Sequence, residues 1–497
     1  MSISAEIAEL WSAGTPIVYL VTAEEDRAVA VCRAAAAAFE ARSAVWSSNR
    51  GLDPLAPGVK DPSALLDAVA KAPGPFMAIA LDFHLALESP AVARKLRDLA
   101  PGFAADGHCL VIVAPRLALP DGVAAEAAVV RLPLPDDAEL GALLDVVQAA
   151  TAGAGAGPLA PDVRHRAVVA ARGLADTQAR RAFTRALRRD PQVGAEGVAT
   201  LAAEKKRLLA RDLGLELVES SERPEDLGGL ATFKAWMEER ALAFAPDADR
   251  FGLPPPRGVL LVGVQGCGKS LAAKAAAARL GVPILRLDLP RVLGARVGAE
   301  EGLTRALEAA EALAPVALWV DEIEKGFAGS ADGADPRAAR LLVAFSTWLQ
   351  ERKGSVFVVA TANDVSRLPP ELLRRGRFDE LFFVDLPDLE ARREILALHL
   401  VRRGRDPEAL DLATLAESSA DYSGAELEQV VVGALHRAYA LGRDLEPADL
   451  RRVAQEVVPL FRTYEEQIKA LREWARGRAR MAGRSGAVID LFRRVAE

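Results

Sequence analysis

The sequence predicts an α/β protein with two successive sheet domains, the second followed by a helical subdomain. Short apolar runs typical of buried strands alternate with longer helical stretches through both halves of the chain. In the second half, one such run leads into a glycine-rich loop that a helical stretch follows at once. This order favours mostly parallel sheets flanked by helices, with a ligand loop at the strand end.

Bulk properties limit the class of protein. A chain of 497 residues is long enough for roughly three domains. No apolar stretch has the length of a membrane span, and the N-terminal residues lack the pattern of a signal peptide. The cysteines Cys32, Cys109 and Cys267 are far apart, so a cytoplasmic, reduced protein is expected. The net charge of −7 disfavours a dedicated nucleic-acid binder.

The glycine-rich loop is the most informative motif. An apolar strand is expected at residues 259–262, and the loop that follows reads Gly263, Val264, Gln265, Gly266, Cys267, Gly268, Lys269 and Ser270, with Leu271 opening the helix. Its glycines allow backbone N–H groups to surround phosphate oxygens at a helix N-terminus. Lys269 is expected to reach the β- and γ-phosphates, and Ser270 to hold Mg²⁺. A chance glycine-rich turn does not account for the strand, the helix, Lys269 and Ser270 occurring together.

Two further predicted strands end in polar side chains. Residues 316–320 are apolar and precede Asp321 and Glu322, while residues 355–362 precede Asn363. Asp321 is expected to bind Mg²⁺ directly or through water, and Glu322 to act as the general base on the attacking water. Asn363 could hold that water or the γ-phosphate, or it could simply be a turn residue.

An arginine-rich turn follows. Arg374, Arg375 and Arg377 surround a glycine, and a guanidinium suits contact with a phosphate and with transition-state charge. The alternative is a basic turn that aids solubility.

Together these motifs resemble the AAA family of ATPases over about residues 223–445. The resemblance implies that Asp226 and Gly228 contact the adenine, that His399 lies near the ribose, and that Gly424 and Ala425 belong to a lid motif closing over the nucleotide. It also implies that Arg374 and Arg377 are arginine fingers acting on a neighbouring subunit, within a ring that is most often a hexamer.

Over nearly its whole length, the chain resembles the stand-alone AAA proteins encoded as a conserved open reading frame in algal plastids and cyanobacteria, with bacterial relatives. One position departs from the pattern of AAA proteins that thread a polypeptide. Arg296 stands where those proteins carry a pore-loop aromatic, so threading by apolar grip is in doubt.

The first half repeats the rhythm of the second. Apolar runs at residues 17–21, 76–81, 109–114 and 129–132 mirror the strands of the later domain. The first run is followed by Thr22-Ala-Glu-Glu-Asp, whose three carboxylates would repel a triphosphate. We therefore expect a degenerate AAA-like domain without a phosphate loop; a generic α/β domain is the alternative.

These inferences define the expected organisation: a degenerate domain at 1–205, a linker at 206–222, a large ATPase subdomain at 223–388, a helical lid at 389–450 and a helical tail at 451–497. The expected function is Mg²⁺-dependent hydrolysis of ATP by a homo-oligomer that remodels a protein client. A switch or assembly factor that does not thread its substrate is the alternative, and a nucleic-acid motor is disfavoured. A membrane protease is excluded, because the sequence has neither a His-Glu-x-x-His motif nor a spanning segment.

Overall fold

The computed structural model describes residues 2–151, 159–219, 222–244, 248–293, 298–327, 335–352, 355–374 and 376–484. The chain divides into two compact units, Met1–Leu201 and Ala202–Glu497. Among the helices in these ranges, none combines the length and the apolarity needed to cross a lipid bilayer.

Unit 1 (Met1–Leu201) begins with a six-stranded sheet in the order β3-β2-β4-β5-β1-β6. Its strands are β1 (Ile17–Val21), β2 (Arg42–Ser47), β3 (Gly51–Asp53), β4 (Phe76–Leu81), β5 (His108–Ala114) and β6 (Ala127–Arg131). All pairs are parallel except β2 with β3. Every residue of β1 and β5 is buried, as expected for central parallel strands covered on both faces.

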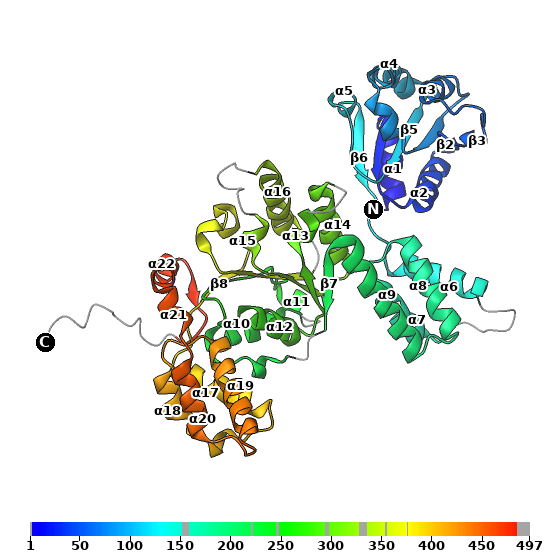
Figure 1. Cartoon of the computed structure of the whole chain (residues 1–497). Helices are drawn as coiled ribbons and strands as arrows, with labels where there is room; N and C mark the ends of the chain where they lie inside the picture. Colours follow the sequence, from blue (N-terminus) through cyan, green and yellow to red (C-terminus); the bar gives the residue numbers. More distant parts are fainter. Residues whose placement is uncertain are drawn as a thin grey trace. The chain divides into compact units, whose positions relative to one another are not determined.

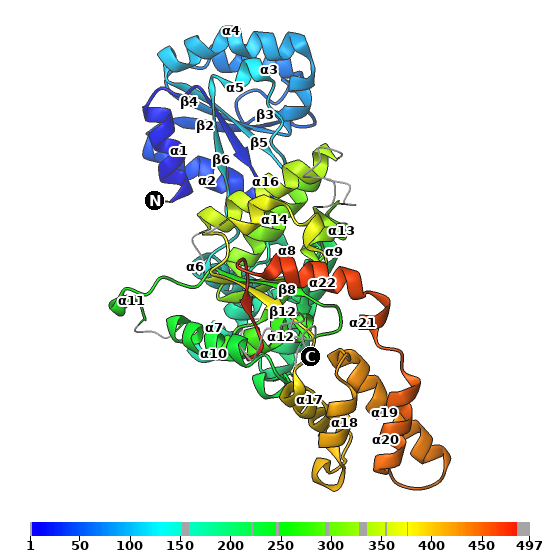
Figure 2. The ribbon, with the colours of Figure 1, turned by 90° about the vertical axis from the view of Figure 1, so that its left-hand side faces the viewer.

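Helices cover both faces of this sheet (Figure 2). On one face, α1 (Ile3–Ser12) and α2 (Glu25–Ala38) pack against alternate residues of β1, such as Val18 and Leu20. On the other, α3 (Pro62–Ala70), α4 (Pro90–Asp106) and α5 (Asp121–Ala124) pack against the intervening residues, such as Ile17 and Tyr19. The 3₁₀ turn η1 (Phe83–Glu88) follows β4.

A group of helices follows the first sheet: α6 (Asp137–Thr151), α7 (Pro161–Ala171), α8 (Asp176–Arg189) and α9 (Ala195–Leu213). Helix α8 shows why these residues fold as they do. Its buried residues, Ala179, Ala182, Phe183, Ala186 and Leu187, recur at helical spacing, and the arginines between them face solvent. Helix α6 packs against both α7 and α8.

Unit 2 (Ala202–Glu497) contains a seven-stranded sheet in the order β13-β12-β8-β11-β10-β9-β7. Its strands are β7 (Leu215–Val218), β8 (Gly258–Gly263), β9 (Ile284–Leu287), β10 (Val316–Val320), β11 (Val356–Ala362), β12 (Glu380–Val384) and β13 (Arg480–Met481). Only β7 runs antiparallel to its neighbour. Strands β8, β10 and β11 are buried throughout. Their packing in the core fixes the strand ends from which the predicted site residues follow.

Helices again lie on both sides of the sheet (Figure 1). One side carries α10 (Ala231–Ala241) and α12 (Lys269–Leu280), whose buried residues share a core with β8, β10 and β11. The other carries α13 (Leu289–Leu293), α14 (Ala299–Ala312), α15 (Ile323–Gly326) and α16 (Pro336–Glu351). Short turns complete this part of the unit: η2 (Pro224–Asp226), η3 (Leu242–Phe244), α11 (Ala248–Phe251), η4 (Val365–Arg367) and η5 (Pro370–Leu373).

The two sheets share one topology. The order β6-β1-β5-β4-β2 in unit 1 matches β12-β8-β11-β10-β9 in unit 2, strand for strand in chain order. In each unit, helices follow the last strand of this set. The predicted fold class, two α/β sheets of the same rhythm with helices after each, is therefore confirmed.

A helical lid follows the second sheet: α17 (Leu389–Val401), η6 (Pro407–Ala409), α18 (Leu412–Ser418), α19 (Gly424–Ala440) and α20 (Pro447–Glu456). These helices have their own apolar core, which includes Leu396, Leu415, Tyr422, Val430 and Leu450. The predicted domain boundaries stay predictions. Helix α9 crosses the division between the two units, and α20 crosses the predicted end of the lid at residue 450.

Two stretches differ from expectation. The expected linker at 206–222 contains the end of α9 and the edge strand β7, in which Leu215 pairs with Leu287 of β9. The expected helical tail contains α21 (Leu460–Thr463) and α22 (Glu465–Ala475), but also β13, which extends the sheet beside β12. Such short edge strands form through pairing with a neighbour, which local sequence pattern does not reveal.

Candidate nucleotide site

The predicted phosphate loop joins β8 to α12 and requires its glycines. Gly263, Gly266 and Gly268 have φ angles of 155°, 77° and 89°, which L-residues with side chains rarely adopt. A Cβ at Gly263 would lie 2.0 Å from the carbonyl oxygen of Val384. Strand β12 therefore presses directly on the start of the loop, and Val264 N–H donates to the same carbonyl at 2.9 Å.

Lys269, the first residue of α12, is buried beneath this loop. Its Nζ donates to the carbonyl oxygens of Gly263 and Val264 at 2.8 and 2.7 Å. Burial lowers the pKa of Lys269 from 10.5 to about 8, although nearby carboxylates oppose the change. A polyanion beside this ammonium would favour its charged form and so raise the pKa of Lys269 again.

The other residues of the loop differ in how far they are exposed to solvent. Val264 and Cys267 are buried, Gln265 is exposed, and Leu271 packs partly against the core shared by α12 and the sheet. Burial raises the pKa of the Cys267 thiol to about 12, so this cysteine is a packing residue and not a reactive thiolate.

Ser270 and Asp321 meet at the carboxyl end of the sheet. The Ser270 hydroxyl lies 3.4 Å from Asp321 Oδ1, and the same oxygen accepts a hydrogen bond from Thr361 Oγ1 at 2.6 Å. A hydroxyl and a carboxylate side by side are oxygen ligands of the kind that Mg²⁺ prefers, so these residues fit that ion. Arg286 also approaches Asp321, at 3.8 Å.

Glu322 and Asn363 lie next to this pair. Glu322 has a left-handed backbone, φ 48°, and its N–H donates to Thr361 Oγ1 at 2.9 Å. Asn363 Nδ2 donates to Glu322 Oε1 at 2.8 Å, and Lys325 forms an ion pair with the other carboxylate oxygen. The structure thus joins Ser270, Asp321, Glu322 and Asn363 through a connected set of polar contacts.

Sequence reasoning missed two residues of this set. Thr361 is 1 % exposed and holds both Asp321 and the backbone of Glu322. Glu324 is 3 % exposed and accepts from the Asn363 N–H at 3.1 Å, while burial raises the pKa of its carboxyl. The available signals were a hydroxyl within an apolar strand and a third acid after Asp321-Glu322.

The predicted arginine fingers lie outside this set. Arg374 is exposed, whereas Arg377 donates through Nη1 to the Glu371 carbonyl. Burial lowers the pKa of Arg377, and the neighbouring Arg374 adds to the effect. Within the part of the chain that the structure describes, neither arginine contacts the Ser270–Asp321 group of its own chain.

The segment at residues 223–230 lies between the lid and the phosphate loop. Asp226 pairs with Arg402 at 3.2 Å, and its pKa is lowered by the Arg223 N–H and then by Arg402. A Cβ at Gly228 would lie 2.5 Å from the Ile395 side chain of α17. Asp226 and Gly228, the predicted adenine contacts, therefore lie where this segment packs against the lid.

The lid motif also reaches the loop. Ser423 caps α19 in a reciprocal pair with Glu426, and Ala425 N–H donates to the Gly266 carbonyl at 3.0 Å. A Cβ at Gly424 would lie 3.3 Å from that same carbonyl. The lid therefore approaches the phosphate loop through backbone.

His399 lies between α17 and α19 of the lid. Its Nδ1 is 3.5 Å from Glu428 and 3.3 Å from Arg403, and burial lowers its pKa although Glu428 opposes this. The contacts place His399 within a charged lid cluster, and its ribose contact stays a prediction. Arg296, the predicted pore-loop position, and Arg375 lie outside the described residues.

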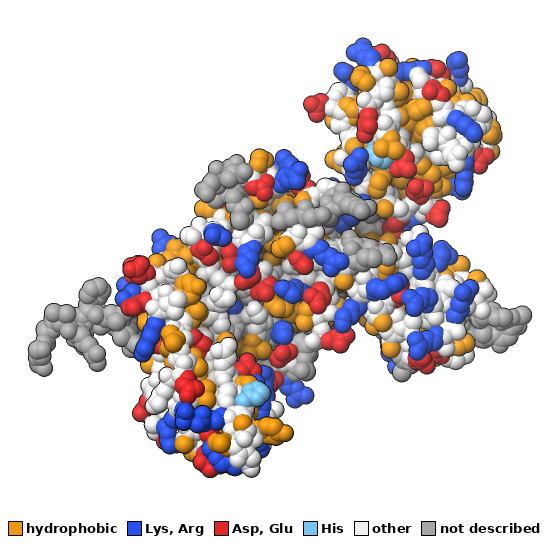
Figure 3. Space-filling model, in the orientation of Figure 1, with side chains coloured by type: hydrophobic (Ala, Val, Ile, Leu, Met, Phe, Trp, Pro, Cys, Tyr) orange, Lys and Arg blue, Asp and Glu red, His pale blue; other side chains and the backbone are white. Residues whose placement is uncertain are grey.

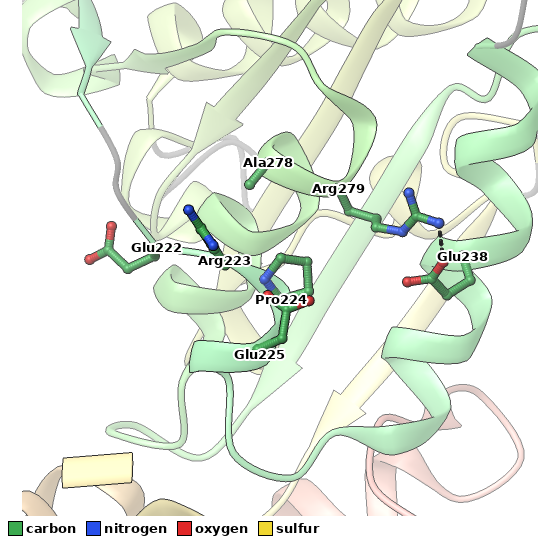
Figure 4. A pocket seen from close by; sticks show the side chains of 7 residues that line it. All are labelled: Glu222, Arg223, Pro224, Glu225, Glu238, Ala278 and Arg279. Atoms are coloured by element: carbon green, nitrogen blue, oxygen red, sulfur yellow. Dashed lines mark hydrogen bonds and ion pairs between the residues drawn. The ribbon is translucent and has the colours of Figure 1, made fainter. Parts of the chain in front are cut away.

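A separate polar pocket lies beside the start of the 223–230 segment (Figure 4). It is lined by Glu222, Arg223, Pro224, Glu225, Glu238, Ala278 and Arg279. Arg279 is already paired with Glu238, and the three acids outnumber the two arginines. This pocket contains none of the loop glycines and is a poor match for a triphosphate.

Comparison with known proteins identifies the family. Residues 259–386 match the model of the ATPase family associated with various cellular activities, AAA. The chain is 35% identical over 493 residues to the AAA domain-containing protein ycf46 of Guillardia theta, covering 97% of both chains. This chain belongs to the AAA ATPase family.

Other comparisons describe the rest of this AAA protein. Residues 3–132 and 138–212 match the N-terminal and second domains of SpoVK-like AAA ATPases. The ycf46 protein of Trieres chinensis is 32% identical and covers 97% of this chain and 98% of its own. A Cell division cycle protein 48 homolog of Archaeoglobus fulgidus is 33% identical over 50% of this chain and 35% of its own length. The full-length likeness therefore lies with ycf46, and the likeness to the archaeal protein covers half of this chain.

Proposed function

We propose that unit 2 binds ATP with Mg²⁺ between its sheet and its lid, and hydrolyses it within a ring of identical chains to remodel a protein partner. The observation that carries this proposal is the connected set formed by Ser270, Asp321, Thr361, Glu322 and Asn363 beside the phosphate loop. These are the groups that phosphoryl transfer to water requires: a cation site, a base and a polar residue that orients the base.

Phosphate binding follows from the loop. Its backbone N–H groups and the N-terminus of α12 favour negative charge, and Lys269 adds a full positive charge next to them. Mg²⁺, when bound by Ser270 and Asp321, would neutralise charge on the phosphates and so make them better acceptors for water. Thr361 keeps Asp321 in place through its 2.6 Å hydrogen bond.

The hydrolytic step falls to Glu322. Its carboxylate is held by Asn363 at 2.8 Å on one oxygen and by Lys325 on the other. To act as a base, Glu322 must exchange one of these partners for the attacking water. Asn363, itself fixed by the buried Glu324, is then placed to hold the water or the γ-phosphate.

Arg374 and Arg377 support catalysis in trans. Among the described residues of their own chain, they contact no member of the catalytic set, as expected for residues that serve a neighbouring subunit. The test mixes two inactive variants, Arg374→Ala and Glu322→Gln. In mixed rings, a site with intact Glu322 can receive an intact Arg374 from its neighbour, so activity should return. No return of activity in verified mixed rings would refute the trans role.

A protein partner is favoured over nucleic acid. On the face of unit 2 shown in Figure 3, acidic and basic side chains are interspersed, and the chain has a net charge of −7. A nucleic-acid motor would need a basic track. Among the relatives over the AAA module are a Cell division cycle protein 48 homolog and a Proteasome-activating nucleotidase of Thermococcus gammatolerans.

A second candidate is an ATP-dependent switch or assembly factor that does not thread its partner. Arg296, at the position where threading AAA proteins carry an aromatic, favours it. A guanidinium does not grip apolar side chains of an unfolded chain as an aromatic ring does.

Capture of the partner tests both candidates. Glu322→Gln should hold ATP and retain the partner in a pull-down, whereas Lys269→Ala, matched in expression, should not. With the wild-type protein and the captured partner, a folded partner released intact on hydrolysis supports the switch, and an unfolded partner supports remodelling. Equal recovery with both variants would contradict nucleotide-dependent engagement.

A further inference from the structure

In unit 1, Glu24 occupies the place that the phosphate loop occupies in unit 2. Strand β1 and helix α2 correspond to β8 and α12 in the shared strand order. Between β1 and α2 stand only Thr22, Ala23 and Glu24, in place of the glycine loop. The Glu24 N–H donates to Thr22 Oγ1 at 3.0 Å, which fixes this short connection.

The Glu24 carboxylate is buried and bound on both oxygens. Its residue is 6 % exposed. Oε1 accepts a hydrogen bond from the N–H of Asp176, the first residue of α8, and Oε2 accepts from Arg27 Nη1 at 3.0 Å. A helix N-terminus and a guanidinium both favour an anion.

Arg27 extends the contact to a second helix. Its side chain forms an ion pair with Glu139 of α6 at 2.7 Å and donates to the Pro133 carbonyl. Glu139 in turn caps its own helix by accepting from the Asp136 N–H at 3.0 Å. Glu24 and Arg27 together therefore bind the end of β1 to both α6 and α8.

Helix α8 is the third α-helix after β6, and its counterpart in unit 2 is α19, the third α-helix after β12, which meets the phosphate loop differently. Helix α19 begins with a reciprocal cap between Ser423 and Glu426, whereas α8 has only one half of such a cap, the bond from the Ala175 N–H to Gln178 Oε1 at 3.2 Å. In unit 2 the contact from α19 is a backbone bond to Gly266, and no carboxylate takes part in it. In unit 1 the contact from α8 goes to the carboxylate of Glu24.

We propose that the junction of β1 with α6 and α8 is an anion site whose ligand is the chain's own Glu24 carboxylate, so that these helices are held against the strand end without a nucleotide. Desolvation raises the pKa of Glu24, while the Asp176 N–H and Arg27 oppose the rise. Burying this carboxylate costs free energy that its two partners offset, and a simple apolar contact would avoid that cost. In this arrangement, α6 and α8 stay packed against the end of β1 whatever the stage of the ATP cycle.

Hydrogen exchange of the intact chain tests this. Glu24→Ala should accelerate exchange at the first amides of α8, residues 176–178, by about 10- to 100-fold, because the helix N-terminus loses its acceptor. Acetate or inorganic phosphate, against chloride at equal ionic strength, should restore part of the protection in Glu24→Ala and change nothing in the wild type. Glu25→Ala, an exposed acid in the adjacent position, is the matched control and should behave as wild type.

Two results would contradict the role of Glu24. Wild-type exchange at residues 176–178 in Glu24→Ala would refute the proposal, as would protection of these amides by ATP in the wild type. If Glu24→Ala does not fold, Glu24→Gln keeps an oxygen acceptor but loses the charge, and should accelerate exchange by about threefold or more. Equal exchange in Glu24→Gln and Glu25→Gln would then overturn it.

Discussion

The buried Lys269 predicts that nucleotide binding takes up a proton. Desolvation disfavours the ammonium, so the folded protein without nucleotide loses this proton near pH 8, whereas an unfolded lysine holds it to about 10.5. The difference corresponds to about 3 kcal/mol against the charged form. A triphosphate beside Nζ favours the ammonium, so its pKa should return towards the ordinary value on binding.

The size of the effect follows from these values. With a pKa of about 8, Lys269 is about one-quarter protonated at pH 8.5 and about nine-tenths protonated at pH 7. Binding should therefore take up about 0.7 proton at pH 8.5 and about 0.1 at pH 7 from this group. The lowered pKa of Lys269 also makes the free energy of unfolding rise with pH between about 8 and 10.5, because in this range the unfolded chain binds more protons than the folded chain.

Isothermal titration calorimetry in buffers of different ionisation enthalpy measures this uptake directly. A non-hydrolysable ATP analogue avoids turnover. Lys274→Met, on the same helix, should keep the uptake, whereas Lys269→Met should lose it together with most of the affinity. No net proton uptake by the wild type at pH 8.5 would refute the reasoning from burial.

Further predictions concern the residues that support the site. Thr361→Val should lower kcat by about 10- to 100-fold with a smaller change in KM for ATP, since both its hydrogen bonds are lost, and Thr361→Ser should recover most activity. Gly263→Ala should destabilise unit 2 by about 3 kcal/mol or more in denaturant unfolding, because its Cβ would meet a carbonyl at 2.0 Å. Gly281→Ala, in open space at the other end of α12, should cost only about 1 kcal/mol. Arg402→Ala should weaken nucleotide binding about two- to fivefold by releasing the partly exposed pair with Asp226, and an unchanged Kd would show that this pair does not support the nucleotide site.

Local motifs account for what could be predicted. The glycine loop, the strand before it and the helix after it are adjacent in sequence, and their φ angles require glycine at 263, 266 and 268. The acids after β10 and the amide after β11 were found because parallel strands end at one edge of a sheet. Their direct contacts, such as Asn363 to Glu322, confirm that they gather at one place.

Pairings between distant segments could not be predicted. Thr361 reads as an ordinary strand residue, because threonine favours strands, until the structure shows both its partners. Strands β7 and β13 exist through pairing with β9 and β12. In the acidic turn after β1, all three carboxylates suggested repulsion of a triphosphate, yet only Glu24 is buried and bound to α8, whereas Glu25 and Asp26 face solvent.

We propose that each chain has one site, in unit 2, that binds and hydrolyses ATP. The most direct test is to count the ATP bound per chain in Glu322→Gln at saturation, and to compare ATP turnover in wild type and Lys269→Ala. We expect one ATP per chain in Glu322→Gln and loss of turnover in Lys269→Ala. Two bound nucleotides per chain, or wild-type turnover in Lys269→Ala, would contradict a single ATP site in unit 2.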